Sequence, residues 1–208
     1  IDELDHALQT LGRPAVLKTR RFGYDGKGQA MIRSDTDASA AFRAIGGQPA
    51  ILEGLVPFER EISVVAARGS DGEVVCFDPT ENEHQDHILK VSRVPAAVAS
   101  EVADDARRIA ERIATAFNYI GVLAVEMFVM ASGSRPTLLV NEIAPRVHNS
   151  GHWTIDGASV SQFEQHIRAI AGWPLGHPIR HGRIEMTNLI GSDRGRRRAA
   201  MDHDLLAV

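Results

Sequence analysis

Apolar residues recur at two spacings along this chain, one helical and one typical of strands. A period of about 3.6 residues predicts a first helix, which Gly12-Arg13-Pro14 ends, and a long helix opened by Pro95. Runs of β-branched residues predict strands, two of them joined by a turn at Ser70-Asp71-Gly72. We expect helices at 2–11, 35–45 (capped by Ser34 or Asp35), 96–117 and 160–171, and strands at 15–19, 29–33, 50–55, 61–67, 74–78, 88–91, 122–130, 137–143 and 185–190. Hairpins and helices mixed in this order predict an α+β fold.

The composition predicts a globular protein without a general affinity for polyanions. Of its 208 residues 44% are hydrophobic, and 23 Lys and Arg against 27 Asp and Glu give a net charge of −4. This balance argues against nucleic acid or a membrane as a partner, so a local cluster must hold any anionic ligand. No apolar run approaches the roughly 20 residues of a membrane helix. The single Cys76 excludes an internal disulfide, which fits a cytoplasmic location.

Two glutamates are the leading candidates for metal ligands. If the strands at 122–130 and 137–143 form a hairpin centred on Ser134, Glu126 lies opposite Glu142. Opposed carboxylates have Cβ atoms about 5 Å apart and repel each other unless a cation lies between them. Mg²⁺ is held by one or two carboxylates together with substrate phosphates, so the pair predicts a site for a nucleotide and its metal. The alternative is that each carboxylate is solvated on an edge strand.

A glycine-rich segment with several cations separates the first two strands. In KTRRFGYDGKGQ (18–29) three glycines let the backbone approach a ligand, namely Gly23, Gly26 and Gly28. Lys18, at the end of a strand, and Lys27 supply charge for phosphates. The segment matches neither the P-loop nor the dinucleotide glycine pattern, so neither of those sites is supported. A flexible hairpin loop without a ligand is the alternative.

A dense polar segment, NEIAPRVHNSGHWT (141–154), begins on the strand that carries Glu142. Arg146 is its best anion binder, and other polar side chains follow, namely His148, Asn149, Ser150 and His152. Such a group beside two carboxylates is more typical of a site than of a linker. Elsewhere, His84 and His87 lack a third metal ligand, and the basic run 194–198 lacks the aromatic residues of a nucleic-acid patch.

These motifs together resemble the N5-carboxyaminoimidazole ribonucleotide synthases, a family of ATP-grasp ligases. The resemblance is carried by FGYDGKGQ, ILEGLVPFEREISVV, the two glutamates, NLIGSD and, most specifically, NEIAPRVHNSGHWT. It implies two α+β lobes with ATP between them, the small lobe at 1–86 and the large lobe at 87–193. Residues 194–208 would begin a C-terminal region, and the N-terminal lobe of the family is absent, so we expect the chain to be a fragment.

The resemblance also implies roles for single residues. Glu126 and Glu142 would hold Mg²⁺, with Mn²⁺ as the alternative ion, and Arg146 would hold bicarbonate or carboxyphosphate. Glu61 would bind the ribose, and 53–56 would hold adenine. The residues expected around ATP are Lys18, Gly23, Tyr24, Asp25, Gly26, Lys27, Gly28, Gln29, Glu53, Gly54, Leu55, Val56, Glu61, His84, Asn141 and Glu142. Those expected in catalysis are Lys18, Tyr24, Asp25, Lys27, Arg146, His148 and Asn149.

The implied reaction is the ATP-dependent carboxylation of 5-aminoimidazole ribonucleotide by bicarbonate, in which a ligase forms a C–N bond in purine biosynthesis and releases ADP and phosphate. A homodimer is also implied. Other ATP-grasp ligases, such as a glycinamide ribonucleotide ligase or a biotin carboxylase, would share Lys18 and both glutamates, but the segment 146–154 argues against them. A non-catalytic nucleotide-binding module is the remaining alternative, and retention of Lys18 and both carboxylates disfavours it.

Overall fold

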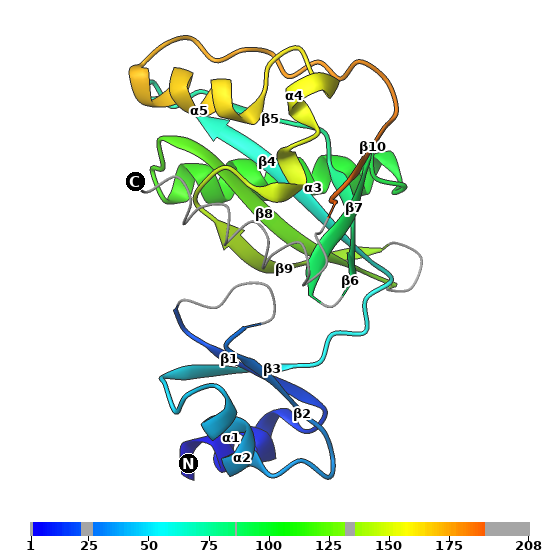
Figure 1. Ribbon diagram of the computed structural model, residues 1–208. Coiled ribbons are helices and arrows are strands. Elements are labelled where there is room, and N and C mark those ends of the chain that lie inside the picture. Colours follow the sequence, from blue (N-terminus) through cyan, green and yellow to red (C-terminus); the bar gives the residue numbers. More distant parts are fainter. Residues whose placement is uncertain (1, 22–26, 86, 132–135, 190–208) are drawn as a thin grey trace, which may run out of the picture.

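The chain folds into two lobes, each built on its own antiparallel sheet (Figure 1). The computed structural model describes residues 2–21, 27–85, 87–131 and 136–189. The small lobe contains α1 (Asp2–Leu11), β1 (Ala15–Thr19), β2 (Gln29–Ile32), α2 (Ala38–Ala44) and β3 (Ala50–Gly54). The large lobe contains β4 (Arg60–Arg68), β5 (Val74–Cys76), β6 (Thr80–Gln85), β7 (Ile88–Val94), α3 (Ser100–Ala116), β8 (Gly121–Met130), β9 (Thr137–Ala144), η1 (Asn149–Gly151), α4 (Thr154–Gly157), α5 (Gln162–Ala171) and β10 (Ile184–Thr187). The α+β class is confirmed.

In the small lobe, β1 lies between β2 and β3, and α1 and α2 contribute to one apolar cluster with the sheet. Leu8 of α1, Leu17 of β1 and Ala41 of α2 are all buried in that cluster. The helix α2 begins later than predicted, because 33–36 forms a turn in which Thr36 Oγ1 accepts a hydrogen bond from the Arg33 amide. Its cap is therefore Asp37, whose Oδ1 accepts from the Ser39 amide, and not Ser34 or Asp35.

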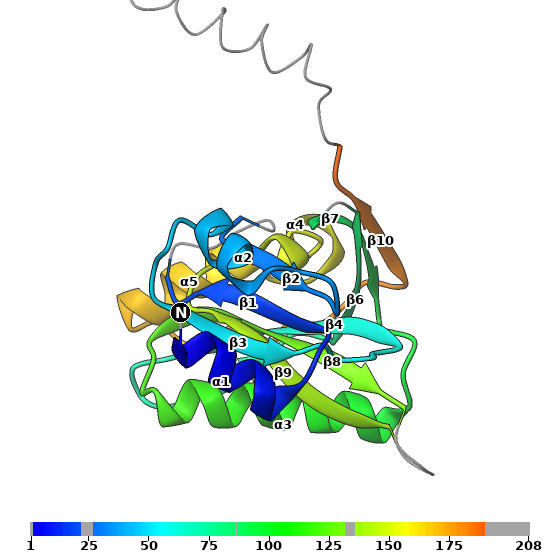
Figure 2. The same ribbon diagram turned by 90° about the horizontal axis from the view of Figure 1, so that it is seen from below.

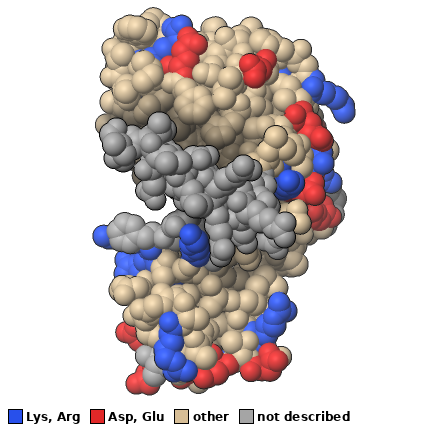
Figure 3. Space-filling view, viewed as in Figure 1, with Lys and Arg blue, Asp and Glu red and all other residues tan. Residues whose placement is uncertain are grey.

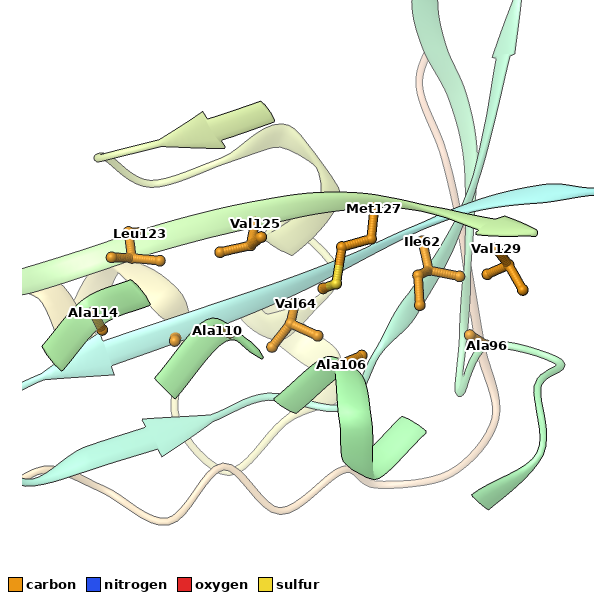
Figure 4. Close-up of a cluster of buried hydrophobic side chains, with 11 residues drawn as sticks. Ile62, Val64, Ala96, Ala106, Ala110, Ala114, Leu123, Val125, Met127 and Val129 are labelled. Atoms are coloured by element: carbon orange, nitrogen blue, oxygen red, sulfur yellow. The ribbon is translucent and has the colours of Figure 1, made fainter. Parts of the chain in front are cut away.

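In the large lobe the strand order is β10-β7-β6-β4-β8-β9, with β5 also paired to β4. Figure 2 shows α3 running along one side of this lobe, and Figure 4 shows its alanines facing β4 and β8. Ala106, Ala110 and Ala114 of α3 are fully buried there against apolar side chains such as Val64 and Val125. Small residues on the helix let it approach the sheet closely. Because α3 covers this face of the sheet, a site can form only on the opposite face.

The opposite face is partly covered by a second apolar cluster around Trp153, which follows η1. Its indole donates a hydrogen bond to Thr80 Oγ1 at 3.1 Å, and its ring meets Phe77 edge to face. Because both faces of β4 are covered, six consecutive residues of that strand, Ile62–Ala67, are buried. None of the helices that the structure describes is long and apolar enough to cross a bilayer.

Three further expectations differ from the structure. The strand β6 was not predicted, because Thr80–Gln85 is almost wholly polar. The helix α3 begins at Ser100 rather than 96, since the Ala96 amide donates to Pro79 O at 2.8 Å and the chain turns there first. The sheets divide at the segment 55–59, whereas the sequence placed the lobe boundary at 86/87; β4, β5 and β6 pair within the larger sheet.

Candidate nucleotide and metal site

Four of the predicted residues, Glu61, His84, Glu126 and Asn141, line a pocket on the face of the large sheet that points away from α3. Leu123, Val125 and Met127 of β8 pack in the cluster against α3, so the alternate residues Glu126 and Phe128 point the other way. The pocket on that face is lined by Glu61, Ile62, Asn82, His84, Glu126, Met127, Phe128 and Asn141. Figure 3 shows Lys and Arg side chains on the small lobe where it approaches the large one.

Glu126 and Glu142 are directly paired on β8 and β9, as predicted. The reason is different from the one expected. Nearer the turn Met127 pairs with Val140, and continuing that register would pair Glu126 with Asn141. A β-bulge leaves Asn141 as an extra residue in β9, so Glu126 pairs with Glu142 instead. Without this bulge Asn141 would face Glu126, so an irregularity that the hairpin argument did not contain creates the carboxylate pair.

The electrostatics of Glu126 reflect this position. The pKa of Glu126 is raised to about 7, mainly by burial and also by the negative charge of Glu142, while His84 and Arg146 act in the opposite direction. The pKa of His148 is lowered to about 4, mainly by burial and also by the charge of Arg146. The pKa of His84 is raised, mainly by its hydrogen bond to Glu61. His148 is therefore a neutral imidazole at pH 7.

The carboxylate pair suits a hard divalent cation that brings its own additional ligands. Burial and mutual repulsion disfavour two negative charges here, and a cation between them would relieve both effects. Among the described residues, no group of three or more His, Cys, Asp or Glu side chains could hold a metal alone. Mg²⁺ commonly takes one or two carboxylates and completes its shell with phosphate oxygens and water, so Glu126 and Glu142 fit that ion.

Lys18 connects the two lobes across the site. Its Nζ lies 2.6 Å from Glu53 Oε2 on the neighbouring strand β3 and 3.3 Å from Asn141 Oδ1 at the bulge of β9. A second polar contact joins Gln29 Nε2 to His87 Nδ1 at 3.3 Å. These contacts hold the end of the β1–β2 hairpin over the pocket, so a cation from the small lobe lies beside the carboxylates of the large one.

The remaining pocket wall combines an ion pair with an aromatic stack. Glu61 Oε2 lies 2.5 Å from His84 Nδ1 across β4 and β6. Phe58, in the connecting segment, stacks on Phe128 of β8 with ring centroids 4.4 Å apart and planes 9° apart. The sequence did not predict this stack. In the same segment the Leu55 amide donates to Pro14 O and the Phe58 amide donates to Val56 O, which fixes the path of the chain between the lobes.

The segment after β9 folds back over the large sheet, where η1 contacts β4, β6 and β7. Arg146 is exposed, and its guanidinium donates to Val147 O. His148 is buried, with Nε2 3.3 Å from Glu126 Oε1. Asn149 begins η1 and is half-buried. Gln162 of α5, which sequence reasoning missed, holds this segment: its Oε1 accepts from His148 N at 2.9 Å and its Nε2 donates to His148 O at 2.7 Å.

Part of the predicted phosphate loop lies outside the described residues, namely Gly23, Tyr24, Asp25 and Gly26. At its described end Lys27 is exposed, and Gly28 has a positive φ of 72°. The Gly28 carbonyl accepts a hydrogen bond from the Thr19 amide at 2.7 Å, which closes the hairpin. A Cβ at Gly28 would lie 2.5 Å from Thr19 Oγ1, so both the backbone angle and the space require glycine here.

Comparison with known proteins decides the family. The family model described as the ATP-grasp domain matches residues 1–163, which include every residue that lines the pocket and also Lys18, which contacts Asn141 from the small lobe. The chain belongs to the ATP-grasp family. The ATP-grasp chain is 56% identical over 189 residues to an N5-carboxyaminoimidazole ribonucleotide synthase of Brucella melitensis, a match that covers 90% of this chain and 51% of that protein.

Two solved structures extend this likeness. The N5-carboxyaminoimidazole ribonucleotide synthetase of Thermus thermophilus is 46% identical with a TM-score of 0.82, over 92% of this chain and 51% of that one. The N5-carboxyaminoimidazole synthase of Aspergillus clavatus, solved with ADP and 5-aminoimidazole ribonucleotide, is 30% identical with a TM-score of 0.85, over 100% of this chain and 54% of that one. The ATP-grasp chain thus spans about half the length of the curated relatives it matches.

Proposed function

We propose that this ATP-grasp chain forms the nucleotide and metal site of an enzyme that carboxylates 5-aminoimidazole ribonucleotide to N5-carboxyaminoimidazole ribonucleotide in purine biosynthesis. The observation that carries the proposal is the segment 141–154, which places Arg146 and the buried His148 beside the carboxylate pair. Relatives that are 56% and 48% identical to this chain are N5-carboxyaminoimidazole ribonucleotide synthases, which supports the same reaction here.

The proposed reaction has two group transfers. An oxygen of bicarbonate attacks the γ-phosphorus of ATP, the bond to the bridging oxygen of ADP breaks, and carboxyphosphate forms. The exocyclic amine of the acceptor then forms a C–N bond with the carboxyl carbon, inorganic phosphate leaves, and the amine loses a proton. Phosphoryl transfer of this kind depends on alignment and charge neutralisation, so it needs no covalent intermediate on the protein.

The residues of the pocket divide these tasks. Lys18, already positioned by Glu53 and Asn141, would neutralise the phosphates of ATP, with the backbone of 23–29 covering them. Residues 53–56 would hold adenine, and Glu61 would accept hydrogen bonds from the ribose with His84 beside it. Mg²⁺, held by Glu126 and Glu142, would supply the remaining positive charge on the phosphates.

Arg146 would bind the bicarbonate and carboxyphosphate anions, because it is an exposed, permanently charged guanidinium close enough to lower the pKa of both Glu126 and His148. His148 and Asn149, with Tyr24, Asp25 and Lys27, are proposed for the acceptor side. His148 is neutral and so can exchange hydrogen bonds without adding charge. Mn²⁺ as the alternative ion, a homodimer and a cytoplasmic location remain predictions.

The deciding experiment measures ADP release by the full-length protein with Mg²⁺ and labelled bicarbonate, with and without 5-aminoimidazole ribonucleotide. Acceptor-dependent ADP release with label in a carboxyamino product is the expected result. ADP release without incorporation would replace the proposal with another ATP-grasp acceptor. Absence of turnover in the presence of nucleotide binding would leave a binding module.

Replacing Arg146 with Ala should lower carboxylation on the order of 10²–10³-fold, because a transition-state anion loses its charged partner. The affinity for ATP should change little, since Lys18 and the carboxylates remain. Arg146→Lys is the matched control: it keeps the charge but loses the two-pronged donor geometry, so its activity should fall between the other two. Near-normal turnover in the Ala variant would remove Arg146 from the mechanism.

Gly28→Ala should weaken ATP binding about 10-fold, a loss of roughly 1.4 kcal/mol, while Gly12→Ala should not weaken it. Both glycines have positive φ, 72° and 80°, so each substitution should destabilise the fold by about 1–2 kcal/mol. Only the Cβ at position 28 meets Thr19; nothing lies within 4 Å of the one at position 12. Thermal melts and nucleotide titrations of both variants would check this, and equal ATP affinities would argue against a role for the hairpin end.

A further inference from the structure

A continuous file of buried polar side chains crosses the large sheet beneath the pocket. It consists of Ser92 on β7, Asn82 on β6, Ser63 on β4, Ser150 in η1 and His148. The exposed fractions of these residues are 0%, 7%, 0%, 0% and 9%. Unpaired polar groups at such depth are costly, so each is expected to hold its full set of partners.

The hydrogen bonds along this polar file run in one direction. Ser92 Oγ donates to Asn82 Oδ1 at 2.9 Å, and Asn82 Nδ2 donates to Ser63 Oγ at 2.8 Å. Ser63 Oγ lies 2.7 Å from Ser150 Oγ, and by their chemistry alone either hydroxyl can donate to the other. Ser150 Oγ in turn lies 2.8 Å from His148 Nδ1.

The backbone fixes the direction of these last two bonds. The Ser150 amide donates to His148 Nδ1 at 3.3 Å, and an amide N–H can only donate. Nδ1 is therefore the unprotonated nitrogen of the neutral ring, and the proton lies on Nε2. Ser150 Oγ therefore donates to Nδ1 and accepts from Ser63 Oγ. Nε2 lies 3.3 Å from Glu126 Oε1, so the protonated side of the imidazole is the one next to the carboxylate.

We propose that the Ser92–Asn82–Ser63–Ser150 file is a positioning device that holds His148 in the Nε2–H tautomer and thereby orients the Glu126 carboxylate. Ser63 also lies directly opposite Glu126 in the pairing of β4 with β8. The file is therefore connected to Glu126 in two ways, through His148 and through this strand pairing. The inference rests on the proposed function only for the identity of Glu126 as a metal ligand. Partners of metal ligands that fix their orientation contribute about 10- to 100-fold to metal affinity in other proteins.

The test uses two buried hydroxyl deletions in the full-length protein. Ser63→Ala breaks the file at its centre. Thr154→Val is the matched control, because Thr154 is also fully buried and its Oγ1 donates to Gly151 O and accepts from Gln162 N, outside the file. Both should lower the melting temperature, so stability alone cannot separate them. If Ser63→Ala fails to fold, Ser92→Ala interrupts the same file at its far end.

Two measurements separate a positioning role from a structural one. Nitrogen-15 histidine spectra of the metal-free protein, with His148 assigned through His148→Gln, should show a pure Nε2–H tautomer in the parent and in Thr154→Val, and mixed tautomers in Ser63→Ala. The Mg²⁺ dependence of ATP binding should weaken about 10-fold in Ser63→Ala alone.

A parent protein with the proton on Nδ1, or a Ser63→Ala variant unchanged in both measurements, would overturn the inference. So would a Thr154→Val variant that shifts as far. If the tautomer responds as expected but the protein does not incorporate bicarbonate, the proposed function fails and the positioning of His148 stands.

Discussion

Glu126→Gln is expected to abolish most Mg²⁺-dependent ATP turnover and, in the same protein, to stabilise the metal-free fold above neutral pH. The loss of turnover, on the order of 10²–10³-fold, follows from removing one of two carboxylates proposed to hold the metal. The gain in stability follows from the position of Glu126, whose side chain is only 17% exposed and is paired with Glu142. Function and stability thus oppose each other at one residue.

The pH dependence of this gain has a definite sign. The pKa of Glu126 is raised from 4.5 to about 7, so its folded form binds a proton more tightly than its unfolded form. The contribution of Glu126 to the free energy of unfolding is complete below pH 4.5 and is lost as the pH rises through 7. At pH 8 the Gln variant should therefore be more stable than the parent by about 2–3 kcal/mol, and at pH 5 the two should differ little.

Thermal melts in EDTA at both pH values would measure the effect, which should be roughly 4–10 °C at pH 8. Glu142→Gln is the matched control: it removes the neighbouring charge but leaves the burial of Glu126, the larger cause, so it should recover only part of the gain. Equal melting temperatures of the parent and Glu126→Gln at pH 8 would show that the parent carboxylate carries no penalty in the metal-free fold. That result would contradict the repulsion on which the metal site is argued.

The strands with strong apolar patterns could be predicted from sequence, and β6 shows why the rest could not. Thr80–Gln85 reads TENEHQ, which resembles a surface segment, yet Thr80 and Asn82 are buried. Their partners, Ser63, Ser92 and Trp153, come from other elements. A polar strand in the middle of a sheet becomes stable only when distant residues satisfy it, and no local pattern records those residues.

The lobe boundary differs from the expected one because it depends on strand pairing. The expected small lobe, residues 1–86, included β4, β5 and β6, whereas β4 pairs with β8 and β6 in the larger sheet. In the structure β6 pairs with β4 and β7, and the division lies at 55–59. Hydrophobic periodicity identifies strands one at a time, whereas lobe boundaries depend on which strands pair.

The candidate site was more predictable than the topology around it, because its residue types are chemically unusual for their positions. The sequence alone shows two glutamates in apolar strands and an arginine with histidines after the second strand. These can be recognised as candidate site residues without knowing how the strands pair. The geometry between them did need the structure. The bulge at Asn141 sets the pairing of Glu126 with Glu142 and also presents the amide oxygen that accepts from Lys18. One inserted residue therefore positions a carboxylate of the large lobe and a contact to the small lobe together.

Gly151→Ala is expected to destabilise the fold by about 3 kcal/mol and to lower carboxylation further than ATP binding. A Cβ at this position would lie 2.6 Å from Gln162 Oε1 and 2.9 Å from Val65 Cγ2, closer than folded proteins tolerate. Gln162 is the group that would have to move, and its amide holds both the N–H and the carbonyl of His148. The substitution would thus leave the buried His148 amide without its partner, leave the His148 carbonyl with only the Gly151 amide, and displace His148 from Glu126.

Gly182→Ala, where nothing lies within 4 Å of the added atom, should change stability by less than about 0.5 kcal/mol. Melting temperatures should fall by roughly 10 °C in the first variant and stay constant in the second. A stable Gly151→Ala protein with normal carboxylation would mean that the segment 141–154 tolerates movement, and the Gln162 clamp would then have no part in positioning the site.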